Sequence, residues 1–388
     1  MKIILVHMHF NDPEKGGPLR SYYLAAGMIS GGIACEVVTA HNQSKYVLKE
    51  VEGIKVHYLP VAYDNAFGFM KRVYAFLKFN EMAARLIRGL DRPDIFYVMS
   101  TPLTTGILAM KLQKILGIPY IFEVGDLWPE APVQMGVVRN VFLKKWLYRL
   151  ETNVYKQARK VVALSPPIGD YIAEKVGREK VTVITNMADT HYFQKDYSSD
   201  EIDKLNKSKV FTVASIGAMG KANQLDFMIE GARYFADNNI PARFLLMGWG
   251  AETSRLKEKA AGIDNVQFIP FGNREEVRKV LGITDALYIS YKDIPVLETG
   301  CPNKLFDALA AGKLVIVNFG GWIARLLEHN QCGFQVNPRD PADLFRKLAP
   351  YFDPSRMEEA SNNARQLAGL YSREVQGEKL VHLLKETL

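Results

Sequence analysis

Short apolar runs alternate with amphipathic stretches along the whole chain. The short runs are rich in β-branched and aromatic residues and predict buried strands, whereas the stretches between them repeat apolar residues at helical spacing. This alternation is typical of parallel α/β sheets. We predict strands in the first half at 3–6, 34–39, 54–59, 94–99, 119–124, 160–164 and 181–184, and in the second half at 211–217, 242–248, 265–269, 286–290, 314–317 and 333–336.

The two sets of strands predict two doubly wound domains in tandem. Residues 189–209 are polar without a clear period, so they are the best linker candidate and a natural hinge. We expect an N-terminal domain over 1–190, a C-terminal domain over 191–370, and a last helix at 371–388 that packs back on the N-terminal domain. Two such domains would face each other across a central cleft, where ligands of these folds usually bind, with the C-terminal helices bracing the pair.

The composition is typical of a globular protein. The chain has 388 residues, of which 48% are hydrophobic and 23% charged, and no apolar run approaches the length of a membrane helix. The N-terminal MKIILVHMHF predicts a first strand rather than a signal peptide. Three widely spaced cysteines indicate a reducing compartment. We therefore predict that the protein is cytoplasmic, either free or at the inner face of the cytoplasmic membrane.

Charge is unevenly shared between the halves. Residues 1–190 hold 24 Lys and Arg against 17 Asp and Glu, whereas residues 191–388 hold 25 of each. The predicted helices at 67–90 and 137–159 are basic and aromatic, which suits peripheral contact with an anionic membrane. Amphipathic helices that simply cover a sheet are an equal alternative. No nucleic-acid-binding module is recognisable, so we expect no nucleic acid partner.

The stretch Ile294–Val317 combines a polar loop, a short helix and an apolar strand. Pro302 suits the first turn of that helix, and Gly312 suits its end. The helix N-terminus favours anions, Lys304 adds a cation in the first turn, and Asp307 follows about one turn later. These groups would hold a phosphate and accept hydrogen bonds from a diol, as a nucleoside diphosphate sugar requires. The alternative is an ordinary helix with two solvated side chains.

Glycine-rich loops follow three predicted strands. Gly217 and Gly220 precede Lys221, which can reach a phosphate, and Gly248 and Gly250 repeat the arrangement. In the first half, the pair Gly16 and Gly17 opens a helix, although such a pair often only makes the turn. None of these loops is a G-x-G-x-x-G or G-x-x-x-x-G-K-[ST] phosphate motif.

A loop after the predicted strand 119–124 gathers Asp126, Trp128 and Glu130 within five residues. A tryptophan beside carboxylates suits a sugar, because the ring meets C–H faces while the acids accept hydroxyls. Either carboxylate would also be able to assist proton transfer from an acceptor hydroxyl. The alternative is a rigid loop whose tryptophan fills the core.

Taken together, these residues resemble family 4 glycosyltransferases of the GT-B fold over nearly the whole chain. The resemblance runs through Gly16, Gly17 and Arg20, and it continues through 183–193, 217–221, 248–250, 265–290 and 302–313. The segments DLWPE (126–130) and PNK (302–304) resemble a branch that builds O-antigen, capsule or exopolysaccharide units, including amino-sugar transferases. Two positions depart from the family pattern, because Thr299 and Asp307 stand where it has its Glu pair. A third departure is Ala218 in place of the usual Arg, and we infer that Lys304 supplies the missing phosphate charge.

The resemblance implies a retaining transfer from a nucleotide sugar, with UDP as our choice of carrier, to a lipid-linked or oligosaccharide acceptor, without metal or other cofactor. We expect Asp126, Glu130, Lys221 and Lys304 to act in catalysis, and Arg20 and Trp128 to bind the acceptor. The expected donor-binding residues are Gly16, Gly17, Gly217, Gly220, Gly248, Gly250, Phe271, Glu298, Thr299, Gly300, Cys301, Pro302, Asn303, Leu305 and Asp307. Two rival functions stay open: a sugar-nucleotide epimerase of GT-B type, and a non-catalytic scaffold of a polysaccharide assembly complex.

Overall fold

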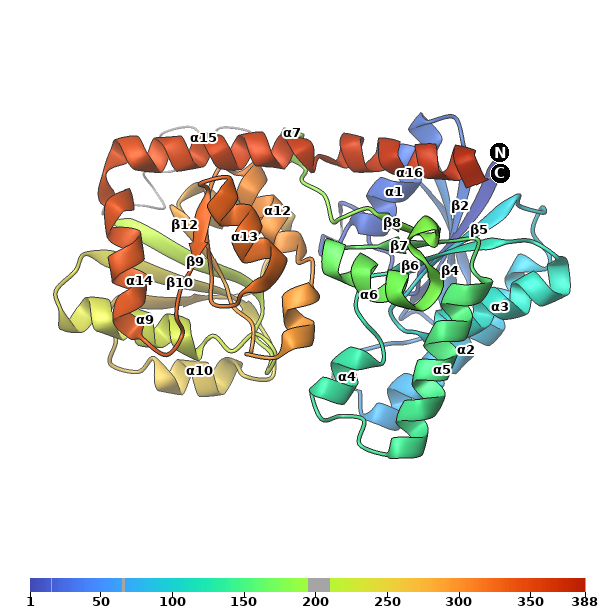
Figure 1. Ribbon diagram of the computed structural model, residues 1–388, viewed down its shortest axis with the longest axis horizontal. Coiled ribbons are helices and arrows are strands. Elements are labelled where there is room, and N and C mark those ends of the chain that lie inside the picture. Colours follow the sequence, from blue (N-terminus) through green and yellow to red (C-terminus); the bar gives the residue numbers. More distant parts are fainter. Residues whose placement is uncertain (15, 65–66, 195–209, 388) are drawn as a thin grey trace. The chain divides into compact units, whose positions relative to one another are not determined.

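The computed structural model describes residues 1–14, 16–64, 67–194 and 210–387, and the chain forms two compact units (Figure 1). Unit 1 comprises Met1–Asn186, Thr299–Cys301 and Arg373–Leu388, and unit 2 comprises Met187–Glu298 and Pro302–Ser372. Each unit contains one twisted sheet flanked by helices, so the predicted α/β fold with two doubly wound domains is confirmed. Most of the predicted linker, residues 195–209, lies outside the described residues.

Unit 1 is built on an eight-stranded sheet in the order β3-β4-β2-β1-β5-β6-β7-β8, parallel except for the β3–β4 pair. The chain winds outward from β1 in one direction and from β5 in the other, which makes β1 and β5 the switch point of this sheet. The strands are β1 (Lys2–Val6), β2 (Ala34–His41), β3 (Val47–Val51), β4 (Ile54–Pro60), β5 (Ile95–Met99), β6 (Tyr120–Val124), β7 (Lys160–Ala163) and β8 (Val181–Val183).

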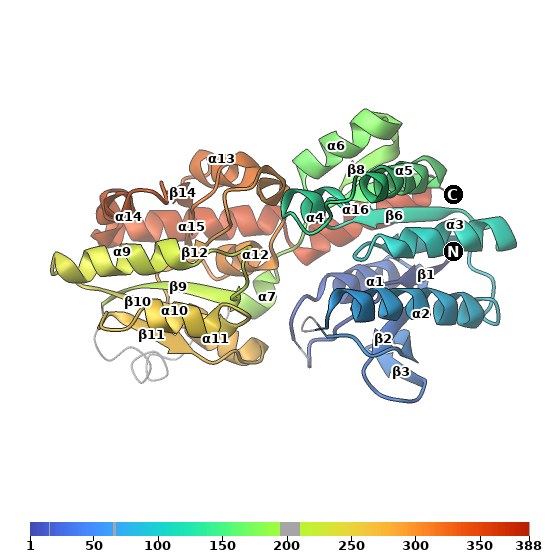
Figure 2. The same cartoon turned by 90° about the horizontal axis from the view of Figure 1, so that it is seen from below.

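Some helices of unit 1 begin or end at capping residues. The side chain of Asn140 accepts a hydrogen bond from the backbone of Leu143 at the start of α5, and Gly117 ends α3 in a left-handed conformation. Helix α3 packs between α2 and α5 (Figure 2). The helices are α1 (Arg20–Ser30), α2 (Phe69–Ile87), α3 (Thr104–Leu116), α4 (Glu130–Gln134), α5 (Val141–Gln157), α6 (Pro166–Val176), the 3₁₀ turn η1 (Arg178–Lys180) and α16 (Arg373–Thr387).

Helix α16 packs on α1 with very little space between the two backbones. A Cβ atom added at Gly27 of α1 would lie 3.2 Å from the Cα of Gly377 in α16. At Gly31 the same atom would come within 2.7 Å of the Val381 side chain. The pattern of small residues therefore fixes where the last helix of the chain joins unit 1.

Unit 2 has a six-stranded, fully parallel sheet in the order β11-β10-β9-β12-β13-β14, with its switch point between β9 and β12. Its strands are β9 (Phe211–Ala218), β10 (Ala242–Trp249), β11 (Val266–Ile269), β12 (Ala286–Ile289), β13 (Leu314–Val317) and β14 (Gly333–Gln335). Its helices are α7 (Thr190–Phe193), α9 (Asp226–Asp237), α10 (Thr253–Lys259), α11 (Arg274–Gly282), η2 (Pro295–Thr299, whose last residue belongs to unit 1), α12 (Asn303–Ala310), α13 (Gly321–His329), α14 (Pro341–Leu348), η3 (Ala349–Phe352) and α15 (Pro354–Leu370).

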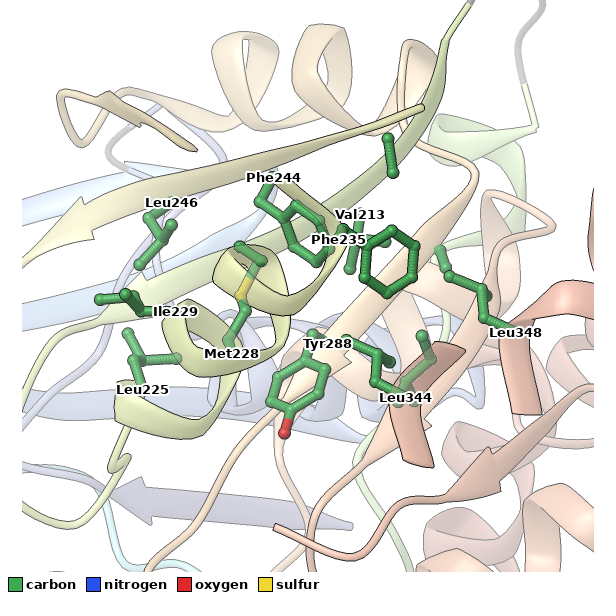
Figure 3. Close-up of a cluster of buried hydrophobic side chains, with 14 of the residues drawn as sticks. Val213, Leu225, Met228, Ile229, Phe235, Phe244, Leu246, Tyr288, Leu344 and Leu348 are labelled. Atoms are coloured by element: carbon green, nitrogen blue, oxygen red, sulfur yellow. The ribbon is translucent and has the colours of Figure 1, made fainter. Parts of the chain in front are cut away.

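The core of unit 2 lies where α9 and α14 meet the sheet (Figure 3). Phe235 of α9 packs edge-on against Phe244 of β10, with ring centroids 5.3 Å apart, and against Phe345 of α14 at 5.7 Å. Leu344 and Leu348 of α14 are buried in the same cluster. Because strands and helices are fixed by this core, the loops at the carboxyl ends of β9 and β12 are held in defined positions.

One strand, β3, was not predicted from the sequence pattern. Strand β3 pairs antiparallel with β4 at the sheet edge, and its middle residues Leu48, Lys49 and Glu50 are exposed. An exposed edge strand needs no continuous apolar face, so composition alone gives it no signal. The other strands lie within one or two residues of their predicted bounds.

Candidate active site in unit 2

The loops singled out in the second half of the sequence meet at the switch point of the unit 2 sheet. Gly217 lies at the end of β9, and the loop after β12 leads into α12, which begins at Asn303. Pro302 precedes the helix rather than standing in its first turn, and no side chain caps the N-terminal amides. The Ser290 hydroxyl at the end of β12 donates to the carbonyl of Gln224, 3.0 Å away, which ties the two loops together.

Lys304 extends from the first turn of α12 toward the end of β9. A Cβ atom at Gly217 would lie 3.5 Å from the Lys304 Nζ, so the glycine leaves room for the ammonium group. The surrounding protein lowers the pKa of Lys304 to about 8 because it removes water from the charge. Among the described residues, this ammonium has no hydrogen-bond or ion-pair partner. It is a cation held without a counter-charge at the sheet edge where ligands of this fold bind.

Asp307 lies one turn further along α12 and is partly exposed. Burial raises the pKa of its carboxyl group to about 7; the positive charge of Arg274 opposes this shift, and the negative charge of Asp189 adds to it. Arg274 forms an ion pair with Asp189 and stacks on Tyr192, with its Cζ 3.8 Å from the ring centroid. Within the described chain, no hydrogen bond to the Asp307 carboxylate is present. This carboxylate is therefore prepared to accept hydrogen bonds from a ligand.

Gly248 and Gly250 allow the β9 and β10 loops to touch. A Cβ atom at Gly248 would lie 1.8 Å from the carbonyl oxygen of Gly217, and one at Gly250 would lie 2.4 Å from that of Met219. The backbone of Met219 also donates to Trp249 at 3.0 Å. Close backbone packing explains both glycines, and their expected contact with a donor stays a prediction.

Replacing Gly248 with alanine is expected to destabilise unit 2 by about 1–3 kcal/mol or more, because the new methyl group must displace a backbone carbonyl. Gly220→Ala is the matched control, since its nearest neighbour would be the Asn223 Oδ1 at 3.6 Å, an ordinary contact. Urea unfolding of both variants measures the difference. Equal stabilities would show that the loops are not packed as described.

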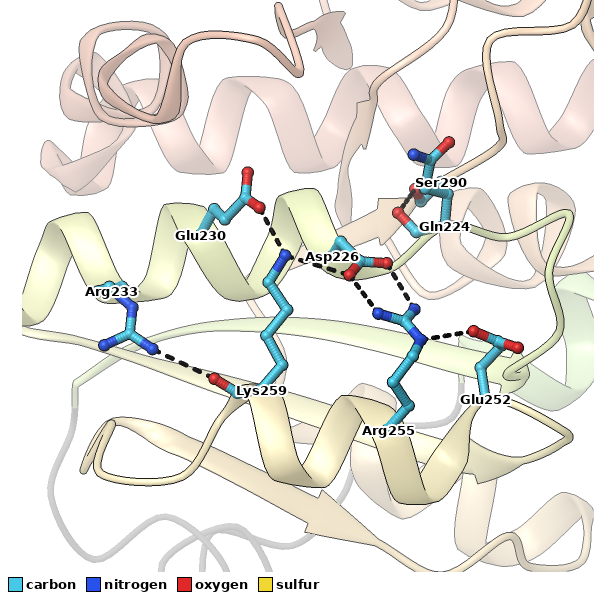
Figure 4. A network of polar contacts seen from close by, with 8 residues as sticks. All are labelled: Gln224, Asp226, Glu230, Arg233, Glu252, Arg255, Lys259 and Ser290. Atoms are coloured by element: carbon cyan, nitrogen blue, oxygen red, sulfur yellow. Dashed lines mark hydrogen bonds and ion pairs between the residues drawn. The ribbon is translucent and has the colours of Figure 1, made fainter.

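A network of charged side chains between α9 and α10 borders the same site (Figure 4). The Arg255 guanidinium donates to both carboxylate oxygens of Asp226 at 2.7 and 2.8 Å, and this pairing lowers the pKa of Asp226 to about 2. A cavity of about 220 Å³ adjoins these residues and is also lined by Lys221 and Lys292. Neither lysine side chain has a partner among the residues that the structure describes. Two further uncompensated cations therefore stand near the switch point.

Several predicted donor residues lie around this region without a defined contact. Glu298 lies over the start of α13, where a Cβ atom at Gly321 would be 3.4 Å from its Oε2. Phe271 is exposed in the loop after β11, Asn303 is partly exposed, and Leu305 is fully buried in the core. The buried Leu305 side chain anchors α12, so only its backbone is able to serve a ligand.

Sequence reasoning did not single out Asp189 and Arg274, whose charges act on Asp307. The Asp189–Arg274 pair joins residues far apart in the chain and carries no local signal.

Predicted site residues in unit 1

Arg20 is buried and bound within unit 1. Its Nε donates to Glu123 Oε1 at 2.7 Å and its Nη2 to Oε2 at 2.8 Å, and the guanidinium also donates to the carbonyls of Ile184 and Thr185. The Tyr97 hydroxyl donates to the same carboxylate. Four N–H groups of Arg20 thus donate hydrogen bonds inside unit 1. A structural role explains Arg20, and its contact with an acceptor stays a prediction.

Gly16 and Gly17 both adopt positive φ angles, of 69° and 80°, just before α1. The Gly16 amide donates to the carbonyl of Asp12 at 3.1 Å. The turn therefore needs glycines for its own geometry, whether or not a ligand approaches.

The loop after β6 holds its polar residues in different ways. Asp126 is exposed, whereas Trp128 is partly buried. The Glu130 carboxylate accepts hydrogen bonds from the Tyr148 hydroxyl at 2.6 Å and from the Gln134 amide at 2.7 Å. Of the two predicted carboxylates, Asp126 is the more accessible to a substrate.

The tripeptide Thr299–Cys301 belongs to unit 1. The Ser165 hydroxyl donates to the Thr299 carbonyl at 2.6 Å, and the side-chain amide of Asn186 donates to the Cys301 carbonyl. Burial raises the pKa of the Cys301 thiol to about 12, so this thiol is neutral and a poor nucleophile. The expected donor contacts of Thr299, Gly300 and Cys301 stay predictions.

Comparison with known proteins

Two family models match most of the chain. Residues 16–187 match the model described as "Glycosyl transferase 4-like domain", and residues 210–352 match the one described as "Glycosyl transferases group 1". The first matched segment contains every strand of the unit 1 sheet except β1, and the second contains the whole unit 2 sheet. This chain belongs to the family 4 type of GT-B glycosyltransferases. The resemblance inferred from the sequence is confirmed at this level, and the finer branch stays a prediction.

Individual relatives of this glycosyltransferase are distant. A Bacillus subtilis protein, TuaH, whose name assigns a glycosyltransferase role in teichuronic acid biosynthesis, is 25% identical over 200 residues, covering 50% of this chain and 49% of TuaH. Sucrose-phosphate synthase from Thermosynechococcus elongatus has a TM-score of 0.79 at 17% identity. The superposition covers 99% of this chain and 98% of the synthase chain. Anabaena HepE, in complex with UDP and glucose, has a TM-score of 0.71 at 17% identity and covers all of both chains. The solved structures are similar in fold.

Proposed function

We propose that this glycosyltransferase moves a sugar from a UDP-sugar, with retention and without metal, to a lipid-linked or glycan acceptor. The pathway would be bacterial surface polysaccharide synthesis at the inner face of the cytoplasmic membrane, and the sugar an N-acetylated amino sugar. The observation that carries the donor site is the pair of unpartnered charges on α12, an ammonium at Lys304 and a carboxylate at Asp307. HepE, bound to UDP and glucose, and TuaH, named for teichuronic acid biosynthesis, support the choice of donor and pathway.

A nucleoside diphosphate fits the charges in one orientation. The diphosphate would lie at the uncapped start of α12, where backbone amides, Lys304 and Lys221 supply positive charge. The ribose would lie one turn along the helix, where its hydroxyls donate to Asp307. Because a helical turn rises about 5.4 Å, both groups of one nucleotide can reach these two residues together.

The same arrangement suits departure of the diphosphate. Negative charge grows on it as the sugar bond breaks, and the fixed cation and amides stabilise that charge without reorganisation. In the retaining mechanism that the resemblance implies, the diphosphate oxygen takes the acceptor's proton on the same face of the sugar. No side-chain nucleophile is then needed, and Asp126 would orient the acceptor hydroxyl.

Thermal unfolding with a panel of UDP, GDP, dTDP, ADP and CMP tests the donor. We expect UDP to raise the Tm by several degrees at saturation, since ligand at about 100 times Kd adds about 2.7 kcal/mol. Lys304→Ala and Asp307→Ala should abolish that shift, whereas Lys292→Ala should reduce it only slightly. A Tm that no nucleotide moves at millimolar concentration would contradict the proposal. Incubation of the donor alone then separates transfer from epimerisation, because a transferase leaves the sugar unchanged.

A further inference from the structure

The loop that follows helix α4 and the first turns of α5 form an exposed apolar surface on unit 1. We define this α4–α5 surface by its exposed apolar residues Met135, Val137, Val141, Phe142, Leu143 and Trp146. Phe142 is 82% exposed and Trp146 is 55% exposed, although large aromatic side chains are usually covered. In Figure 1, α4 and the beginning of α5 project from the rest of their unit. A cluster of this kind indicates a binding surface.

The charge around the α4–α5 surface has one sign. Residues 131–150 contain no Asp or Glu, but they contain Arg139, Lys144, Lys145 and Arg149. In the described part of the chain, none of these four side chains forms an ion pair. The nearest acid, Glu130, is already occupied by Tyr148 and Gln134. The surface therefore offers uncompensated positive charge beside exposed apolar groups.

The surface is held rigidly at its base. Asn140 caps the start of α5, and near the other end the buried Glu151 forms an ion pair with Lys175 of α6. Because α5 is capped at its start and anchored to α6 through Glu151, its first turns form a preformed surface, and little conformational entropy is lost when it docks.

We propose that the α4–α5 surface docks on an anionic lipid bilayer. Aromatic and aliphatic side chains mixed with Lys and Arg suit the boundary between lipid headgroups and acyl chains. A protein partner fits less well, because lysine is depleted in protein–protein interfaces whereas two adjacent lysines stand here. Among the described residues no helix is long and apolar enough to span a bilayer, so this contact would be peripheral.

The surface begins at the edge of the sheet where the parallel strands have their carboxyl ends. Helices that connect parallel strands start at the carboxyl ends of those strands, so α5 begins on the same edge as the loop that carries Asp126. Helix α2 starts at this edge too and exposes Met70 and Tyr74. Docking of the α4–α5 surface on a bilayer would bring a lipid-linked acceptor close to the loop that carries Asp126. This last point rests on the proposed function, whereas binding to lipid does not.

Vesicle flotation with the full-length protein tests the proposal. We expect binding to vesicles of equal parts phosphatidylcholine and phosphatidylglycerol, and much weaker binding to phosphatidylcholine alone. Lys145→Glu with Arg149→Glu should weaken binding by at least about 25-fold, because each basic residue near an anionic surface contributes about 1 kcal/mol. Phe142→Ser with Trp146→Ser should also weaken it more than about tenfold.

The matched control lies on α3, at the opposite edge of the same sheet. Ile115 is 50% exposed and stands beside Lys111 and Lys114, so Ile115→Ser with Lys111→Glu changes similar groups away from the surface and should leave binding unchanged. Vesicles should also shift the tryptophan emission of the native protein to shorter wavelength, and Trp146→Phe should remove that shift.

Three outcomes would overturn the proposal: equal binding to both kinds of vesicle, loss of binding in the α3 control, or a native dimer that Phe142→Ser with Trp146→Ser converts to monomer. The last would assign the surface to a second copy of the chain. Because flotation needs neither donor nor acceptor, failure here is distinguishable from failure of the proposed UDP-sugar site, which nucleotide-induced Tm shifts report.

Discussion

Replacing Lys304 with methionine is expected to lower kcat by about a hundredfold to a thousandfold, or about 3–4 kcal/mol of transition-state stabilisation. The ammonium stands at the uncapped start of α12 with no counter-charge among the described residues, so its charge is fully available to a leaving diphosphate. Methionine keeps most of the length of the side chain and lacks only the charge. Steady-state transfer assays with saturating donor measure the effect.

The pH dependence gives this prediction a second readout. Because the pKa of Lys304 is about 8, kcat/KM should fall as pH rises through about 8, where the free enzyme loses the charge. Lys304→Arg should keep some activity and remove that alkaline limb. Bound diphosphate favours the protonated amine, so the corresponding limb of kcat should lie at higher pH.

Lys313 provides a matched control for Lys304. Burial also lowers its pKa to about 8, and it stands beyond the opposite end of the same helix, before β13. Lys313→Met should therefore leave kcat unchanged while it alters stability. If Lys313→Met reduced kcat as much as Lys304→Met, the effect would reflect a disturbed helix rather than a catalytic charge.

The sequence predicts the sheets better than the contacts between their loops. Strands such as β5 and β13 are continuous apolar runs because both their faces are buried, and such runs are visible without any structure. The antiparallel edge strand β3 is exposed on its middle residues, so the same criterion cannot detect it. Hydrophobic patterning indicates which elements are buried, so it cannot identify elements that are exposed.

The candidate site shows the same limit at the level of single residues. Lys304 and Asp307 could be predicted because helical spacing and a helix N-terminus are local features of the sequence. The packing role of Gly248 could not be predicted, because it depends on the Gly217 carbonyl of a neighbouring strand. Only the register of β9 and β10 brings the two residues close. Arg20 shows the same limit, because its ion pair with Glu123 of a distant strand has no local signal in the sequence.

The Asp307→Asn variant is expected to bind UDP at least about tenfold more weakly and yet to be more stable than the native protein without ligand. Two ribose hydroxyls would lose a charged acceptor, and hydrogen bonds to charged groups contribute about 1.5–3 kcal/mol each. Stability should move the other way, because the native carboxylate is held in protein without a hydrogen-bond partner among the described residues. Isothermal titration and urea unfolding measure the two effects on the same samples.

The sign of the pH dependence follows from the raised pKa. The carboxyl group has a pKa of about 7 in the folded chain and 3.8 as its ordinary value, so between these values the folded protein holds a proton that the unfolded chain has lost. The native protein should therefore lose stability from this group as pH rises from about 4 to about 7. At about 1.36 kcal/mol per pKa unit the loss is at most about 4 kcal/mol, and less because the side chain keeps some solvent contact.

The stabilisation in Asp307→Asn should consequently be near zero at pH 4 and largest above pH 7. Asp285→Asn is the control: burial also raises the pKa of Asp285, but its carboxylate accepts a hydrogen bond from the Thr212 amide at 2.7 Å, so this variant should not gain stability and should bind UDP normally. A stability difference in Asp307→Asn that did not vary with pH would contradict the desolvated carboxylate. A residue that weakens the empty fold and strengthens the complex is retained for its ligand, because binding supplies the hydrogen bonds that folding leaves unmade.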